Sequence, residues 1–230
     1  MSTVLLVRHG LTAMTGPVLA GRTPGVHLDE RGQTQASAVA ARIAALPLAA
    51  VVTSPLERCV ETATVIREAQ KTPPEWVVDD RLIECGYGDW TGRPIKELAK
   101  DPLWKVVQGQ PSAVRFPNGE ALTEMSARAV SAVRDWDARL GDDAVWVACT
   151  HGDVIKAIVA DALGLHLDQY QRIVPDPCSV SVIRYTATRP YALRVNDTGG
   201  ELAAFAPPKR RRRRGGDDAT VGGGAGDGAV

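Results

Sequence analysis

The sequence has few cysteines, and they are placed without any pattern that indicates a disulfide scaffold or a metal site. The 230 residues contain four cysteines, with no C-x-x-C pair and no spacing typical of metal ligands. Free thiols in a reducing compartment are therefore expected. The four are Cys59, Cys85, Cys149 and Cys178.

Long apolar runs are also missing. No stretch approaches the roughly 20 apolar residues that a membrane-spanning helix needs. The start of the chain lacks the pattern of a secretory signal peptide, because Arg8 and His9 interrupt its first apolar run. We therefore expect a cytoplasmic protein without membrane contact.

The chain has no net charge, but this balance averages two unlike parts. Residues 1–206 carry 21 basic and 24 acidic side chains, whereas residues 207–230 carry 6 and 3. The mild acidity of the first part argues against a nucleic-acid-binding face. The second part, rich in arginine and glycine, cannot bury enough apolar surface to order itself. We expect a single domain over 1–206 and a disordered tail over 207–230, in which the basic run 209–214 attracts nucleic acid weakly at most.

Apolar runs and amphipathic segments alternate along the first part of the chain. This alternation predicts an α/β fold, a three-layer α/β/α sandwich with a mostly parallel central sheet. Loops are expected over 10–28 and, apart from one short helix near 94–100, over 81–119. The predicted strands are 3–8, 49–53, 76–79, 144–150, 179–185 and 191–195, with a short addition at 202–205, and the predicted longer helices are 29–44, 55–69, 120–140 and 153–163.

Two of the predicted strands end at a histidine. Residues 4–7 lead into Arg8 and His9, and residues 145–149 lead into Thr150 and His151. Open α/β sheets bind their ligands at the carboxyl edge of the strands. Two histidines at that edge, with a buried arginine whose planar fork suits phosphate oxygens, favour phosphoryl transfer through a phosphohistidine. Each histidine taken alone would more often be structural.

Arg58 and Glu84 are two further candidates for chemistry. Arg58 lies in the first turn of a predicted helix, where the partial positive charge of the helix N-terminus disfavours a cation. It therefore either faces an anionic ligand or forms a surface ion pair with Glu57 or Glu61. Glu84 precedes a loop rich in glycine and aromatic residues. It is either a general acid that burial keeps protonated or a plain surface carboxylate.

These residues, taken together, resemble the histidine phosphatase superfamily, in its phosphoglycerate mutase-like branch. The resemblance rests on Arg8-His9-Gly10, Arg58, Glu84 and Thr150-His151-Gly152, and extends over about residues 3–200. It implies that His9 is the phosphorylated nucleophile, that Glu84 is the proton donor and later the base, and that no cofactor or metal is needed. It also implies the remaining site residues: Arg8, Arg58 and His151 as the grip on the phosphoryl group, and Gly10, Thr12, Arg22 and Gly152 as substrate-binding positions.

The details of the sequence favour a phosphatase within that branch. The acid phosphatases and phytases of the superfamily typically carry aspartate after the second histidine, where Gly152 stands here. Residues 86–92 read G-Y-G-D-W-T-G, similar to an element common in its small-molecule phosphatases. The resemblance thus implies a phosphomonoesterase that acts on a small phosphorylated metabolite. The alternatives are a mutase that needs a bisphosphate primer and an inactive binding protein of the same fold. The strands near 179–195 would permit a homodimer.

Overall fold

The computed structural model describes residues 2–199, which form a six-stranded sheet in the order β3-β2-β4-β1-β5-β6. Three of the five neighbouring pairs are parallel, and β5 runs antiparallel to both of its neighbours. The predicted mostly parallel sheet is therefore confirmed, as a mixed sheet with two antiparallel pairs at one side. The strands are β1 (Thr3–Arg8), β2 (Leu48–Thr53), β3 (Glu75–Val78), β4 (Val145–Thr150), β5 (Val180–Arg184) and β6 (Tyr191–Asp197).

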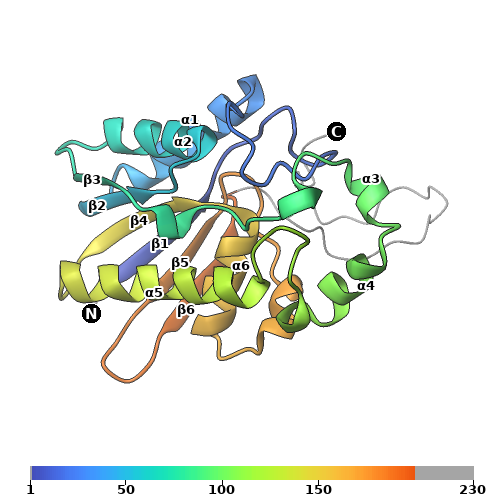
Figure 1. Cartoon of the computed structure of the whole chain (residues 1–230). Helices are drawn as coiled ribbons and strands as arrows, with labels where there is room; N and C mark the ends of the chain where they lie inside the picture. The colour runs from blue at the N-terminus through green and yellow to red at the C-terminus, as the bar shows by residue number, and fades with distance from the viewer. Residues whose placement is uncertain (1, 200–230) are drawn as a thin grey trace, which may run out of the picture.

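Helices cover both faces of this sheet, which makes the predicted three-layer sandwich (Figure 1). Helices α1 (Glu30–Ile43) and α2 (Glu57–Glu68) pack together on one face. Helices α5 (Leu122–Leu140) and α6 (Gly152–Ala162) pack together on the other. The remaining helices are α3 (Ile95–Leu98), α4 (Pro102–Gly109) and four short 3₁₀ turns at Asp80–Leu82, Gly88–Trp90, Pro111–Ala113 and Leu167–Arg172.

The central strands are apolar throughout because both of their faces are buried. In β1, Val4 and Leu6 belong to the apolar cluster under α5 and α6, whereas Leu5 and Val7 belong to the cluster under α1 and α2. Successive side chains of a strand point to opposite faces, so a strand covered on both sides reads as a continuous apolar run.

Most predicted elements are confirmed, and the differences have local causes. Asp29 caps α1 by accepting a hydrogen bond from Gly32 N at 2.8 Å. The prediction of a single short helix within 81–119 was wrong: α4 also lies there, with Asp101 as its N-cap and Pro102 in its first turn. Those residues form a recognisable helix start that the density of prolines obscured. The predicted strand at 202–205 and the tail at 207–230 lie outside the described residues.

The connections of β1 and β4 leave the sheet in opposite directions. These strands are parallel neighbours, yet α1 after β1 and α6 after β4 pack on opposite faces (Figure 1). Such a divergence opens a crevice at the carboxyl ends of the strands, where ligands of α/β sheets bind. Strand β6 is the last strand on the antiparallel side of the sheet, so one of its sides has no neighbouring strand among the described residues. Pairing of this strand with a second copy of the chain stays a prediction.

The described residues also bear on the predictions about thiols and membranes. All four cysteines are free and buried. None of the helices within 2–199 is both long and apolar enough to span a bilayer.

Candidate active site

Three parallel strands bring polar side chains to the same edge of the sheet. His9 follows β1 and donates its backbone N–H to Thr150 O at 3.0 Å; Ser54 follows β2 and donates to Cys149 O at 3.0 Å. His151 follows β4, and its ring centroid lies 5.3 Å from that of His9, at an interplanar angle of 63°. The two predicted histidines therefore meet because the strands that carry them are neighbours.

His9 is held as a neutral imidazole by hydrogen bonds at both ring nitrogens. Its Nδ1 donates to Gly10 O at 2.8 Å, and Arg58 Nε donates to its Nε2 at 3.3 Å. This pattern assigns the proton to Nδ1 and the lone pair to Nε2. Burial holds the pKa of His9 well below its ordinary value of 6.5, and the charges of Arg58 and Arg8 lower it further. A neutral imidazole is the state a nucleophile requires.

Both predicted arginines are buried beside this histidine, at 1% exposure for Arg8 and 2% for Arg58. Arg8 Nη1 donates to Pro175 O at 2.9 Å, and burial lowers the pKa of its guanidinium. Arg58 Nη2 donates to Gly21 O at 2.7 Å, but its buried Nη1 has no hydrogen-bond partner. A buried cationic donor without a partner is costly unless a ligand meets it.

The alternative of a surface ion pair for Arg58 is excluded by its neighbours. Glu61 pairs with His27, and Glu57 accepts a hydrogen bond from Gly25 N at 3.0 Å. Neither carboxylate is a partner of Arg58, whose cationic group faces inward.

His151 lies behind His9 and is fully buried. Its Nδ1 accepts from Arg58 Nη2 at 3.3 Å, so its Nε2 carries the proton and donates to Ser54 Oγ at 2.8 Å. Burial and the charge of Arg58 hold the pKa of His151 well below its ordinary value. It is therefore neutral here, and it would become an imidazolium only with a bound anion that raises its pKa.

Glu84 is buried, with 3% exposure, which excludes the plain surface carboxylate. Its Oε1 accepts from Cys85 N at 2.9 Å. Burial and the nearby Asp153 carboxylate raise the pKa of Glu84 to about 7, although Arg58 and Arg8 oppose that rise. A carboxyl that is still partly protonated near neutral pH can act as a general acid.

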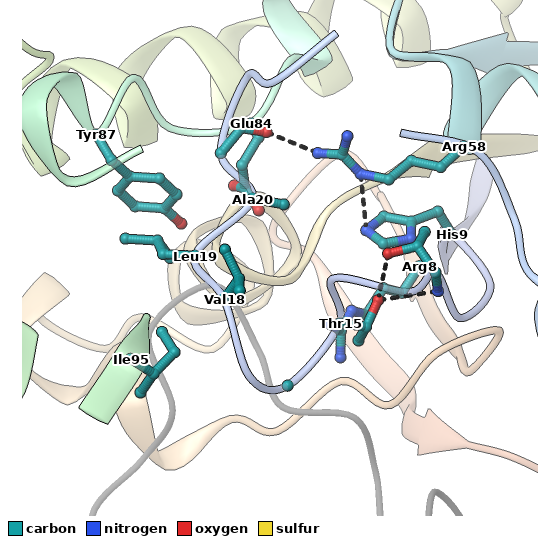
Figure 2. Close-up of a pocket in the computed structure, with 13 residues that line it drawn as sticks. Arg8, His9, Thr15, Val18, Leu19, Ala20, Arg58, Glu84, Tyr87 and Ile95 are labelled. Atoms are coloured by element: carbon teal, nitrogen blue, oxygen red, sulfur yellow. Dashed lines mark hydrogen bonds between the residues drawn. The ribbon is translucent and has the colours of Figure 1, made fainter. Parts of the chain in front are cut away.

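Arg8, His9, Arg58 and Glu84 line one end of a pocket of about 410 Å³, a volume that includes space open to solvent. His151 is not among the lining residues. In Figure 2, Arg8, His9 and Arg58 lie together on one side, and Glu84 and Tyr87 lie on the other. The wall away from the charged groups is largely apolar. It is formed by Val18, Leu19, Ala20, Tyr87 and Ile95.

Of the predicted substrate-binding residues Thr12, Arg22 and Gly152, only Thr12 lines the pocket. Thr12 lines the pocket, and its hydroxyl lies 2.9 Å from that of Thr15. Arg22 does not line it; its Nε donates to Glu84 O at 2.8 Å. Gly152 is buried as the first residue of α6 and is not among the lining residues either.

Gly10 differs from expectation in its physical role. Its N–H donates to Thr62 Oγ1 at 3.1 Å, so this donor is used within the protein and not by a bound anion. A Cβ at this position would lie 2.7 Å from Gly32 O, in the first turn of α1. The glycine is required because two stretches of backbone approach closely.

A buried polar cluster beneath the pocket was not found from the sequence. Tyr87 donates its hydroxyl to Asp153 Oδ2 at 2.8 Å, and Lys156 Nζ lies 3.1 Å from Asp153 Oδ1. Both charged residues are buried on α6. Their i, i+3 spacing in an otherwise apolar helix was an available signal. Ser54 was also missed, although it ends its strand as the histidines end theirs.

The described residues include no cluster of three or more His, Cys, Asp or Glu side chains that could hold a metal ion. Four aromatic and basic residues of the segment 81–119 do not line the pocket: Trp90, Arg93, Trp104 and Arg115. Trp90 stacks on Trp104 at 6.1 Å between ring centroids, and Arg115 pairs with Glu124.

Comparison with known proteins gives a consistent result. Residues 4–198 match the histidine phosphatase superfamily (branch 1). Phosphoserine phosphatase 1 of Hydrogenobacter thermophilus is 30% identical over 204 residues, which cover 86% of this chain and 93% of that protein. A probable phosphoglycerate mutase, GpmB of Cronobacter sakazakii, is 32% identical over 80% of this chain and 86% of its own length. The solved structure of Bacillus stearothermophilus YhfR superposes with a TM-score of 0.75 at 27% identity, over 86% of this chain and 98% of that one.

Proposed function

This chain belongs to the histidine phosphatase superfamily, and we propose that it is a metal-independent phosphomonoesterase that forms a phosphohistidine on His9. The observation that carries the proposal is the pairing of a neutral His9, whose Nε2 carries a lone pair that accepts from Arg58 Nε, with the buried Arg58 Nη1 that has no partner. One is a nucleophile and the other is a vacant cationic donor within the same pocket. The substrate is a small phosphorylated metabolite.

In the first step His9 Nε2 attacks the phosphorus, and the bond from phosphorus to the ester oxygen breaks. Arg8 and Arg58 stabilise the negative charge on the phosphoryl oxygens. Such electrostatic stabilisation is the main contribution to catalysis of phosphoryl transfer. Glu84 gives its proton to the leaving alcohol oxygen. His151 lies behind this site and stabilises the same oxygens when the anion raises its pKa.

In the second step water replaces the alcohol. The Glu84 carboxylate takes a proton from water, and the resulting hydroxide oxygen attacks the phosphorus as the bond to Nε2 breaks. Inorganic phosphate leaves, and both His9 and Glu84 return to their starting states. A carboxyl whose pKa is about 7 serves well in both directions, because efficient acid–base groups have pKa values near the working pH.

A mutase is the second candidate, since one relative is named a probable phosphoglycerate mutase. Such an enzyme must hold a bisphosphate with a carboxylate, which calls for several cations. Among the described residues that line the pocket, Arg8 and Arg58 are the arginines, no lysine is present, and the far wall is apolar. This lining favours a monophosphate ester and therefore hydrolysis.

The test is phosphate release from 4-nitrophenyl phosphate and from a panel of phosphorylated metabolites, with a chelator present. Wild type should turn over, and His9→Ala should lose about 10³-fold or more of the rate. Acid-labile, base-stable ³²P label on wild type but not on the variant would identify the intermediate. If wild type releases no phosphate from any ester, the phosphatase assignment is wrong, and 3-phosphoglycerate with a bisphosphate primer tests the mutase.

A further inference from the structure

The main chain of Glu84 is held from outside the pocket by two arginines. Arg22 Nε and Arg128 Nη2 both donate to Glu84 O, at 2.8 Å and 3.1 Å. Arg128 Nη1 also donates to Ile83 O at 2.6 Å and to Arg81 O at 2.7 Å. One guanidinium therefore binds three carbonyl oxygens within the four residues 81–84.

Glu120 joins the two arginines to each other. Its Oε2 accepts from Arg22 Nη2 at 2.9 Å and from Arg128 Nη2 at 3.0 Å, and its Oε1 accepts from Arg128 Nε at 2.7 Å. Its backbone and side chain both bind Gly86, at 2.7 Å and 3.0 Å. Burial alone would raise the pKa of Glu120, but hydrogen bonds from Arg128 and Gly86 hold it below its ordinary value, so the carboxylate is ionised.

These contacts join three separate parts of the chain at one point. Arg22 comes from the segment between β1 and α1, Glu120 lies two residues before α5, and Arg128 is in the second turn of that helix. None of the three lines the pocket. Charge-assisted bonds of this kind are among the stronger and more directional in proteins, and together the contacts hold Ile83 on one side of Glu84 and Gly86 on the other.

We propose that Arg22, Glu120 and Arg128 form a positioning clamp that sets the carboxyl of Glu84 at the leaving-group oxygen. The proposal rests on the proposed function, because it assigns the clamp to the proton-transfer step. It also gives Arg22 a role different from the substrate contact expected from the sequence. A displacement of about 1 Å in a catalytic group can cost about 10²-fold in rate.

The proton that Glu84 supplies matters only when the leaving alcohol is a poor leaving group. An alkyl alcohol must be protonated as it departs, whereas 4-nitrophenolate leaves without a proton. The ratio of kcat/KM for an alkyl phosphate to that for 4-nitrophenyl phosphate therefore reports the position of Glu84. Since kcat/KM covers only the steps up to departure of the alcohol, the later hydrolysis of the phosphohistidine does not enter this ratio.

The experiment compares wild type with Arg22→Met, which removes the donors and keeps a long side chain. We expect kcat/KM for glycerol phosphate to fall by about 10- to 100-fold and that for 4-nitrophenyl phosphate to fall by less than about threefold. Arg22→Lys should recover part of the loss. Arg115→Met is the matched control, because Arg115 pairs with Glu124 in the first turn of α5 and not with Glu84.

A double-variant cycle excludes a merely structural effect. In a Glu84→Gln background, Arg22→Met should cause little further loss on glycerol phosphate, because the group it positions is already absent. Equal losses on both esters, or full additivity in the cycle, would overturn the clamp. Glu120→Gln repeats the comparison if Arg22→Met fails to fold. Should wild type hydrolyse neither ester, the proposed function and the clamp both fall, whereas normal turnover with an unchanged ratio in the variants overturns the clamp alone.

Discussion

Replacing Glu84 with glutamine should stabilise the folded protein at neutral and higher pH. In the folded state burial and Asp153 raise the pKa of Glu84 from 4.5 to about 7. The unfolded chain ionises this group near its ordinary value, so between these two pH values the unfolded state loses a proton that the folded state keeps. The free energy of unfolding is therefore not reduced by Glu84 below pH 4.5, where the carboxyl is protonated in both states. It falls as pH rises from 4.5 to about 7, because the buried carboxyl of the folded protein resists ionisation.

The size of the effect follows from the same shift. At 1.36 kcal/mol for each pKa unit, ionised Glu84 costs the folded protein about 3 kcal/mol above pH 7. Glutamine keeps the shape and cannot ionise, so it escapes this cost. The free energy of unfolding of the variant minus that of wild type should therefore be about 3 kcal/mol larger at pH 8 than at pH 4.5.

Urea unfolding of wild type and Glu84→Gln at both pH values measures this gain. Other titrating groups contribute nearly equally to both proteins, so they cancel in the comparison. Any packing defect caused by the amide lowers the stability of the variant by the same amount at both pH values. A pH-dependent gain below about 1 kcal/mol would show that Glu84 ionises nearly normally and that its proposed role as an acid at neutral pH is wrong. The stabilised variant should be a poorer enzyme on alkyl esters, a usual trade between stability and function.

Two further substitutions test other parts of the structure. Ser54→Ala should lower kcat/KM for 4-nitrophenyl phosphate by about tenfold, because His151 Nε2 would lose the acceptor 2.8 Å away; unchanged kinetics would contradict that role. Gly32→Ala should cost about 3 kcal/mol and about 10 °C in thermal midpoint, because a Cβ would lie 2.1 Å from Leu11 O. Gly109→Ala, where a Cβ meets nothing within 4 Å, is the matched control in calorimetry, and equal midpoints for the two variants would refute the steric argument.

The sequence by itself determined most of the elements, α4 excepted, and the residues at the ends of the central strands. Apolar runs that stop at His9 and His151 indicated buried strands whose carboxyl ends meet, because hydrophobic periodicity is a local property. The start of α1 at Asp29 was equally readable from its cap. These features depend on neighbours within a few residues, so they can be inferred without knowing which strand lies beside which.

The tertiary structure alone decided how those residues act. That β4 lies between β1 and β2 places Ser54 against His151, and no local pattern contains that order. The same holds for Arg22, which the resemblance offered as a substrate contact and the structure places on Glu84 O.

The protonation of Glu84 is the clearest case of this division. Its pKa depends on burial and on Asp153, 69 positions further along the chain. The position of its backbone carbonyl depends on a hydrogen bond from Arg128, 44 positions away in the chain. Burial and charge are set by groups that are distant in sequence and close in space. A carboxyl with nothing unusual in its local sequence therefore gains the raised pKa that its proposed role requires only when the fold is complete.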